Sequence, residues 1–188
     1  MAHRRFPPDD PGRRLFQDPE RVLDVIGVVP GMTFLDVGCG EGYFALPAAR
    51  RVGASGRACG IDVDGEAVTR LLDRAAGEGM GWVSARAAAA EETVLCSGCG
   101  DVLFFGICLH DFSDPGRVLR NARRMVRPGG VLADLDWHAR EMPLGPPQEK
   151  RFTPVHAAAL IRDAGFRIES LRDCGPYHYL ILARLRPR

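Results

Sequence analysis

The feature that most constrains the fold is an apolar run that breaks into glycines at alternate positions. Residues 33–43 read Thr-Phe-Leu-Asp-Val-Gly-Cys-Gly-Glu-Gly-Tyr. A continuous apolar run that ends in glycines is typical of a buried parallel strand that turns over a ligand. Glycine permits the unusual backbone angles of such a turn and lets the backbone approach the ligand closely. Because one glycine suffices for a turn, we interpret Gly38, Gly40 and Gly42 together as a ligand-binding loop.

The chemistry of this loop favours one class of ligand over another. The backbone amides that follow the glycines lie at the start of a helix, where they favour an anionic group such as a carboxylate. The nicotinamide fingerprint is G-x-G-x-x-G, and its last place is taken here by Tyr43. The loop therefore speaks against a nicotinamide-dependent oxidoreductase, although that class stays open as the weakest alternative.

An acid follows the loop at the distance that a nucleoside site requires. The next predicted strand, residues 57–63, ends in Asp62, about 20 residues beyond the loop, where α/β folds place an acid on the ribose hydroxyls. A carboxylate accepts hydrogen bonds from both hydroxyls of a cis-diol. Capping of the next helix is the alternative role for Asp62 or Asp64. We favour Asp62 as the ligand and Asp64 as the cap.

Strand and helix patterns alternate along the rest of the chain and predict one α/β domain. Strands are expected at residues 34–37, 57–63, 82–85, 101–107, 131–137, 166–171 and 177–185. Helices are expected at residues 19–26, 43–52, 65–76, 115–126 and from 154 to a stop at Gly165. The link at residues 172–176 is too short for a parallel crossover, so the last two strands should form an antiparallel hairpin.

Three local expectations follow from single residues. The helix at 19–26 should bury Val25 together with Val22, Leu23 and Ile26. Pro47 lies inside the predicted helix 43–52 and should kink it. Residues 1–18 are rich in Pro, Arg and Asp and should be irregular, either as a lid or as a loosely packed arm before the domain at 19–188.

Several polar residues follow the central strands at the edge where ligands bind in open α/β sheets. Gly106 ends one strand and is followed by His110 and Asp111, and Asp136 with Trp137 ends the next strand. These residues should lie close to the glycine loop. A catalytic role for His110 and a structural role both remain open at this point.

Composition excludes several function classes. The formal net charge is +1, which speaks against a dedicated nucleic-acid binder. The N-terminus has no apolar core of signal-peptide length, and no apolar stretch of the chain reaches the length of a membrane span. The six cysteines show no disulfide rhythm, so a cytoplasmic protein with reduced thiols is the simplest expectation. A single C-x-x-C lacks the remaining ligands of a structural zinc site, so we interpret Cys96 and Cys99 as two thiols in a loop and expect no metal.

The order and spacing of these motifs resemble those of class I S-adenosylmethionine-dependent methyltransferases. The resemblance rests on residues 35–42, 60–62, 109–111 and 126–130 and covers roughly residues 19–186. Short relatives of the ubiquinone/menaquinone-biosynthesis methyltransferases look most similar. The resemblance implies a Rossmann-like, seven-stranded, mostly parallel sheet with one antiparallel strand and helices on both faces. It also implies S-adenosylmethionine as cofactor and S-adenosylhomocysteine as product.

The resemblance also implies roles for single residues. Those near the cofactor would be Asp36, Gly38, Cys39, Gly40, Gly42, Tyr43, Asp62, Val63, Ala88, Ala89 and Gly106. The three glycines would cradle the methionyl and ribose region, with Asp36 supporting the loop or the amino group. Alanines stand where many relatives carry an acid that binds adenine, so Ala88 and Ala89 would line the adenine edge. The chain lacks the inserted cap of many relatives, so residues 1–18 and 138–152 would cover the acceptor.

The function expected from this resemblance is methyl transfer to a small-molecule acceptor. His110 or Asp111 would act as general base with help from Asp136, while Tyr43 and Trp137 would shape the acceptor pocket. Cys39 and Cys108 leave open a methyltransferase directed at thiols or metalloids, and a cofactor-binding regulator without turnover is a further alternative. No nucleic-acid or membrane partner is expected. The acceptor, the methylated atom and the oligomeric state, with a homodimer possible, stay undetermined by the sequence.

Overall fold

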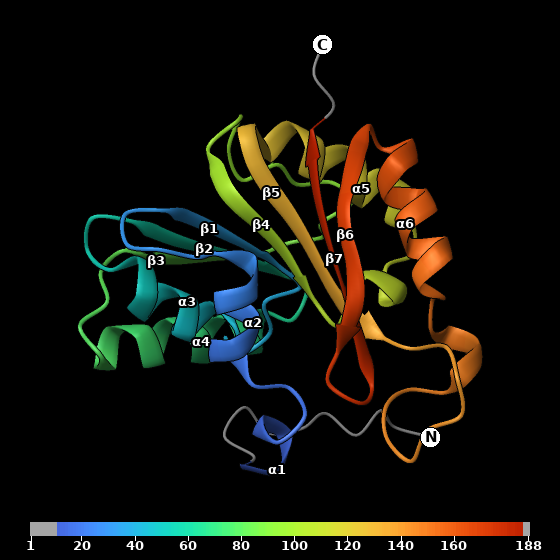
Figure 1. The fold of residues 1–188 in the computed structure, drawn as a ribbon. Helices are drawn as coiled ribbons and strands as arrows, with labels where there is room; N and C mark the ends of the chain where they lie inside the picture. The colour runs from blue at the N-terminus through green and yellow to red at the C-terminus, as the bar shows by residue number, and fades with distance from the viewer. Residues whose placement is uncertain (1–10, 186–188) are drawn as a thin grey trace.

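The computed structural model describes residues 11–185, and this part of the chain forms one seven-stranded sheet between helices (Figure 1). The strands stand in the order β3-β2-β1-β4-β5-β7-β6. Their bounds are β1 Thr33–Val37, β2 Arg57–Asp62, β3 Val83–Ala87, β4 Gly100–Gly106, β5 Val126–Trp137, β6 Phe166–Cys174 and β7 His178–Leu185. The predicted α/β class with seven strands is confirmed.

Strand directions also agree with the prediction. Strand β1 pairs in parallel with both β2 and β4, and the pairs β2–β3 and β4–β5 are parallel as well. Strand β7 runs antiparallel to both of its neighbours, β5 and β6. The short turn between β6 and β7 allows only a hairpin, which inserts β7 between β5 and β6. The carboxyl ends of β1, β2, β4 and β5 therefore meet at one edge.

Helices cover both faces of the sheet (Figure 1). Helices α5 and α6 bury residues such as Leu119 and Ile161 against Leu103 and Phe105 of β4. Helices α2 and α3 pack on the opposite face, around Phe104. The helical bounds are α1 Pro11–Arg14, α2 Pro19–Ile26, α3 Ala45–Val52, α4 Gly65–Gly77, η1 Leu109–Asp111, α5 Pro115–Met125, η2 Gln148–Lys150 and α6 Pro154–Asp163.

Four helices within residues 11–185 begin at a side-chain cap, of which Asp64 was predicted above. The side chains of Asp18, Asp64, Asp114 and Thr153 each accept a hydrogen bond from a backbone N–H in the first turn of the helix that follows. Such side chains satisfy amides that have no partner within the helix, which fixes the residue at which the helix begins.

Three local predictions were wrong. Val25 is 38% exposed, because Val22, Leu23 and Ile26 share the buried face of α2 and Val25 lies at its flank. Helix α3 begins at Ala45 rather than at residue 43, so Pro47 lies in the first turn, where proline is tolerated. Strand β5 begins at Val126 rather than at residue 131. Residues 126–130 therefore belong to this strand and do not form a link between it and α5.

The N-terminal segment is only partly irregular. Residues 11–14 form the short helix α1, which corrects the expectation of an irregular segment through residue 18. Residues 1–10 lie outside the described part of the chain, so the expectation for them stays a prediction.

The prediction of six reduced thiols was also wrong. Cys96 and Cys99 form a disulfide in the loop before β4. Gly98 lies between them with φ +59°, and its N–H donates to the Arg124 carbonyl at the end of α5. This turn brings the two Cα atoms to 6.0 Å, within the usual range for a disulfide. The other four cysteines of the chain are free.

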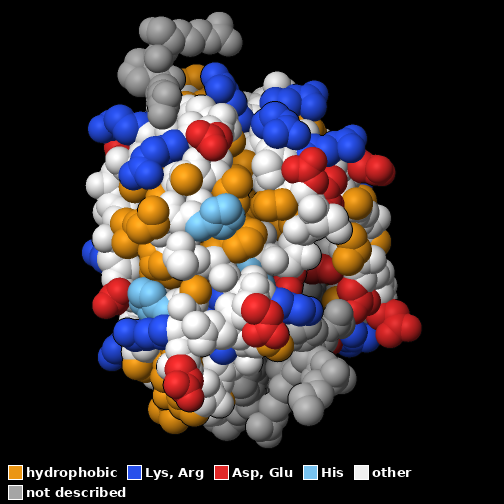
Figure 2. Space-filling model, turned by 90° about the vertical axis from the view of Figure 1, so that its right-hand side faces the viewer, with side chains coloured by type: hydrophobic (Ala, Val, Ile, Leu, Met, Phe, Trp, Pro, Cys, Tyr) orange, Lys and Arg blue, Asp and Glu red, His pale blue; other side chains and the backbone are white. Residues whose placement is uncertain are grey.

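The surface over α6 and β6 mixes charges of both signs with scattered apolar side chains (Figure 2). The exposed apolar residues of these two elements include Val155, which is 74% exposed, and Leu171, which is 44% exposed. This face carries no extended patch of one charge. No helix within residues 11–185 is long and apolar enough to cross a membrane.

One acid lies inside the core of the sheet. Asp134 of β5 is fully buried, and no described residue donates a hydrogen bond to either carboxylate oxygen. Burial raises the pKa of Asp134 well above its ordinary value, and the charge of Asp136 on the same face of β5 raises it further. Asp134 is therefore a neutral carboxylic acid in the folded protein.

This protonation state has a consequence for stability. Because unfolding releases the Asp134 proton above the ordinary pKa of 3.8, the free energy of unfolding should fall as pH rises from there toward the raised pKa. Asp134→Asn removes the titration, so the variant should gain stability relative to wild type by up to about 1.4 kcal/mol per pH unit in this window. Urea unfolding at several pH values measures the difference, and a difference independent of pH would show that Asp134 is ionised when folded.

Candidate active site

The glycine loop between β1 and α3 adopts a conformation that side chains rarely tolerate. Gly38, Gly40 and Gly42 have φ angles of +81°, +49° and +87°. A Cβ at Gly38 would lie 2.8 Å from the Cys108 sulfur, and one at Gly42 would collide with Leu71. A Cβ at Gly40 would meet nothing within 4 Å. Packing thus requires Gly38 and Gly42, whereas Gly40 presents open backbone.

Asp62 lies directly against this loop. Its Oδ2 accepts a hydrogen bond from the Gly40 N–H at 2.8 Å, and its Oδ1 accepts one from the Asp64 N–H at 3.0 Å. Asp64 caps α4 by accepting from the N–H groups of Glu66 and Ala67. The expected division holds for the cap at Asp64, and Asp62 keeps lone pairs on both oxygens for a ligand diol.

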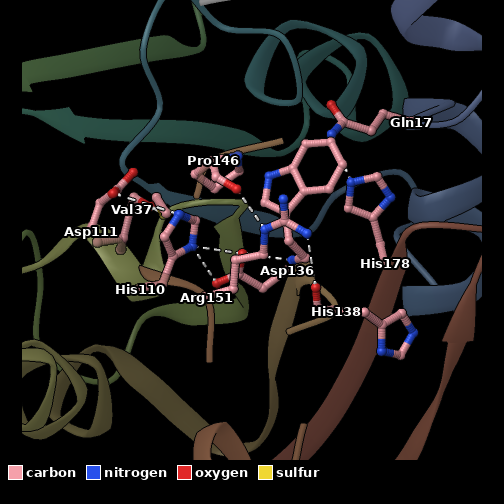
Figure 3. A network of polar contacts seen from close by, with 11 residues as sticks. Gln17, Val37, His110, Asp111, Asp136, His138, Pro146, Arg151 and His178 are labelled. Atoms are coloured by element: carbon pink, nitrogen blue, oxygen red, sulfur yellow. Dashed lines mark hydrogen bonds and ion pairs between the residues drawn. The ribbon is translucent and has the colours of Figure 1, made fainter. Parts of the chain in front are cut away.

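His110 and Asp136 meet at the ends of β4 and β5 (Figure 3). The Nδ1 atom of His110 lies 2.7 and 2.9 Å from the two Asp136 oxygens, and Asp136 Oδ1 also accepts the Trp137 N–H. Nδ1 therefore donates, which leaves Nε2 as the basic nitrogen. Nε2 lies 3.5 Å from Asp111 Oδ1. The side chains of His110 and Asp136 are 2% and 1% exposed, and that of Asp111 is 56% exposed.

The electrostatics of His110 are set by several opposing effects. Burial lowers the pKa of His110, while the hydrogen bond and charge of Asp136 and the charge of Asp111 raise it. Arg151 lowers it again, and the balance lies above the ordinary histidine value. The sequence predicted His110 or Asp111 as the base. His110 is the one that a carboxylate, Asp136, orients, whereas Asp111 is exposed to solvent.

The backbone that leads into His110 is unusual. Ile107, directly after β4, has φ +66°, a left-handed conformation that costs a β-branched residue free energy. Its N–H donates to the Leu135 carbonyl at 2.8 Å, which holds the turn against β5. Gly106 before it has no room for a Cβ, because Phe44 and Phe104 pack against it.

The N-terminal segment lies over this edge through residues that the sequence did not single out. The Tyr43 hydroxyl donates to the Gln17 carbonyl, and the Gln17 side chain lies 2.9 Å from His178 Nε2. The Arg13 guanidinium lies 3.5 Å from the centre of the Tyr43 ring. Gln17 is 3% exposed. No local pattern marks Gln17 or His178, because their burial depends on contacts between opposite ends of the chain.

A family model for a methyltransferase domain matches residues 35–133, more than half of the chain. The matched region holds the glycine loop, Asp62 and His110, whose geometry is described above. The chain belongs to the S-adenosylmethionine-dependent methyltransferases.

Other methyltransferases support this membership at the level of fold and sequence. A structure of a SAM dependent methyltransferase from Aquifex aeolicus covers 97% of this chain and 100% of its own, with 30% identity and a TM-score of 0.89. Nocamycin O-methyltransferase from Saccharothrix syringae is 36% identical over 60% of this chain and 40% of its own length. The ubiquinone/menaquinone biosynthesis C-methyltransferase of Vibrio parahaemolyticus is 30% identical over 61% of this chain and 45% of its own. The resemblance to that group is confirmed, and the chain spans less than half of each of these two curated relatives.

The residues at this edge of the methyltransferase fit its cofactor. Asp62 presents a carboxylate suited to the ribose diol, and Val63 beside it is 74% exposed, an apolar surface suited to adenine. Asp36 is 2% exposed, and its pKa is raised to about 7 by burial and then by the charge of Asp62, while the Ala45 N–H lowers it. A cationic amino group nearby would favour the ionised form of Asp36.

The residues predicted to line the adenine edge are small and are held by backbone contacts. The Ala88 N–H donates to the Asp62 carbonyl at 2.8 Å, and both Ala88 and Ala89 are partly buried. The side chain of Glu91 accepts a hydrogen bond from the Ser113 N–H. Asn121 of α5 donates to the carbonyls of residues 90 and 91 and so fixes this loop. This role of Asn121 was not predicted from the sequence. The one signal in the sequence is that Asn121 is an amide on a helix whose other polar residues are mostly arginines.

The thiols near the site of this methyltransferase fill space. Cys39 packs against Gly60, and the Cys108 sulfur donates to the Val37 carbonyl at 3.0 Å. Burial raises the pKa of both thiols. A metalloid would need thiolates, and burial makes these two thiols poor ones, so Cys39 and Cys108 give no support to a metalloid-directed enzyme. Within residues 11–185, no cluster of three or more His, Cys, Asp or Glu side chains could hold a metal ion.

The proposed division between Asp62 and Asp64 can be tested by a matched pair of variants. Asp62→Ala removes a charged acceptor of about 1.5–3 kcal/mol per hydrogen bond, so S-adenosylhomocysteine should bind about 10- to 100-fold more weakly. Asp64→Ala removes only the cap of α4 and should cost about 1 kcal/mol of stability with little effect on affinity. Calorimetry measures both, and equal loss of affinity in the two variants would contradict the division.

Proposed function

We propose that this methyltransferase modifies an acidic hydroxyl of a small-molecule acceptor, with His110 as the general base. The observation that carries the proposal is the hydrogen bond between His110 Nδ1 and Asp136, which fixes the tautomer and leaves Nε2 to accept a proton. Relatives named as O- and C-methyltransferases of small molecules support this class of acceptor. The exposed carboxylate of Asp111 would mark the entry side of the ring.

In this reaction the protein would mainly align the acceptor with the cofactor and accept the acceptor's proton. When bound over the glycine loop, S-adenosylmethionine would supply a methyl group on a sulfonium, an electrophile that an aligned acceptor oxygen could take with S-adenosylhomocysteine as the leaving group. His110 Nε2 takes the hydroxyl proton, and Asp136 stabilises the imidazolium that results. Holding the acceptor in line converts a bimolecular encounter into a positioned one, which can lower the barrier by about 7–11 kcal/mol in well-oriented systems.

The segments around the site would provide the acceptor pocket and exclude water. Trp137 lies beside the dyad, with its ring 4.2 Å from the His178 ring, and Phe16 of the N-terminal segment packs on both. Tyr43 is tied to the same segment through Gln17. We therefore propose that residues 11–18 act as a lid, and that Tyr43 and Trp137 form walls of the acceptor pocket.

The role of His110 predicts a separation of turnover from cofactor binding. His110→Ala should lower kcat by about 10²- to 10⁴-fold, because general base catalysis is lost, while affinity for S-adenosylhomocysteine stays near wild type. In wild type, kcat/KM should rise with pH through a pKa above the ordinary histidine value, because the base must be neutral. Release of S-adenosylhomocysteine with a panel of phenols and enols measures turnover.

The control for this experiment is Asp111→Asn, which should reduce turnover far less than His110→Ala. Parallel loss of turnover and cofactor affinity in His110→Ala would mean that His110 only supports the loop. Cofactor binding without turnover on any acceptor would favour a cofactor-binding regulator instead.

A further inference from the structure

The loop after β5 folds around a single guanidinium. Arg151 Nε donates to the Pro146 carbonyl at 2.7 Å, and Nη2 donates to the Leu144 carbonyl at 3.2 Å. Nη1 donates to the carbonyls of His138 and Arg140 at 3.3 and 2.9 Å. Four of the five N–H groups of a guanidinium are thus used, which leaves one on Nη2. Arg151 is 9% exposed.

The charge of Arg151 has no carboxylate partner among residues 11–185. All of its hydrogen bonds go to neutral carbonyls, and no ion pair forms with the acids nearby. Burial lowers the pKa of Arg151, and only the distant charge of Glu149 opposes this. A guanidinium stays protonated even so. A buried cation without a counter-ion is costly unless an anion meets it.

This cation lies at the reacting edge of the sheet. In Figure 3 its guanidinium stands between the rings of His110 and His178. It lies 6.0 Å from the centre of the Trp137 ring. Its charge lowers the pKa of His110 and contributes, after burial and the charges of His138 and Arg13, to lowering that of His178 to about 3.

The acids around it are already engaged or exposed. Asp136 is bonded to His110 and to the Trp137 N–H, and Asp173 pairs with His138 at 3.0 Å. Asp111 is 56% exposed. Asp134 is the neutral acid of the core. The carboxylates of Asp136 and Asp111 raise the pKa of His110 more than Arg151 lowers it. Asp111 is exposed to solvent, however, whereas Arg151 is a buried charge on this side without a carboxylate partner among the described residues.

We infer that Arg151 is a specificity-determining residue that selects acceptors whose reacting oxygen becomes anionic when it loses its proton, the phenol and enol class. This inference rests on the proposed function and names the acceptor class of the same site. As the hydroxyl proton passes to His110 Nε2, the negative charge left on the acceptor oxygen is stabilised by Arg151. An acceptor without an ionisable hydroxyl gains nothing from this charge, and a cationic amine is repelled by it.

The test uses two probes that share one aromatic ring, of which one is anionic at the reacting oxygen and the other is neutral and carries one more methyl group. These are 4-nitrophenolate, at a pH where the phenol is ionised, and 4-nitroanisole, its neutral methyl ether. Both are titrated against the full chain loaded with S-adenosylhomocysteine, with tryptophan fluorescence as the signal. Wild type should bind nitrophenolate at least about tenfold more tightly than nitroanisole, as a charge-assisted contact of this kind provides.

Three variants separate charge from loop folding. Arg151→Met should lose the preference, while Arg151→Lys should keep most of it because the charge remains. Arg140→Gln, which removes an exposed cation of the same loop, should leave the preference unchanged. In an NMR titration of the histidine ring, Arg151→Met should also raise the pKa of His110, whereas Arg151→Lys should not.

Each contrary result overturns the inference. Wild type that binds nitrophenolate no more tightly than nitroanisole, including binding of neither, contradicts it. Equal loss of both probes in the Lys and Met variants would mean that Arg151 only holds the loop. An unchanged pKa of His110 in Arg151→Met would contradict it as well. Failure of wild type to bind S-adenosylhomocysteine would instead overturn the proposed function.

Discussion

The hydrogen bond from the Gly40 N–H to the Asp62 carboxylate is the contact on which the arrangement of this site depends. It joins the loop after β1 to the end of β2, and the N–H groups of Gly38 and Cys39 add two bonds to the Ile61 carbonyl. A bond to a charged acceptor contributes about 1.5–3 kcal/mol. The loop therefore stays at the carboxyl edge with the open backbone of Gly40 held against the Asp62 carboxylate.

The acids at this edge differ in how many hydrogen-bond donors each one meets. Asp136 receives His110 Nδ1 and the Trp137 N–H, whereas Asp134 on the same face of β5 receives no donor from the described residues, and burial raises its pKa well above the ordinary value. Burial also raises the pKa of Asp36, to about 7. A carboxylate that meets two donors thus stands beside one imidazole, and the charge of Arg151 lowers the pKa of that imidazole. This distribution suits removal of a proton from a weak acid better than binding of a cation.

Much of the fold could be predicted because its signals are local. The caps at Asp18, Asp64 and Asp114 and the glycines of the loop act within a few residues of their own position. The errors arose where distant residues decide. The burial of Val25 was predicted from the pattern of its own helix, but Val25 is exposed in the structure. Cys96 and Cys99 were predicted from the cysteine pattern to be free thiols, but the turn at Gly98, which is bonded to the end of α5, brings them together as a disulfide.

The sequence by itself determined the order of strands and helices, the turn at the glycine loop, and the presence of acids and a histidine after successive strands. Only the tertiary structure decided that His110 meets Asp136 across 26 residues and that Gln17 meets His178 across 161. It also decided that Arg151 stands at the site without a counter-ion. The physical reason is that backbone conformation depends on neighbours in the chain, whereas burial, pairing and charge balance depend on neighbours in space.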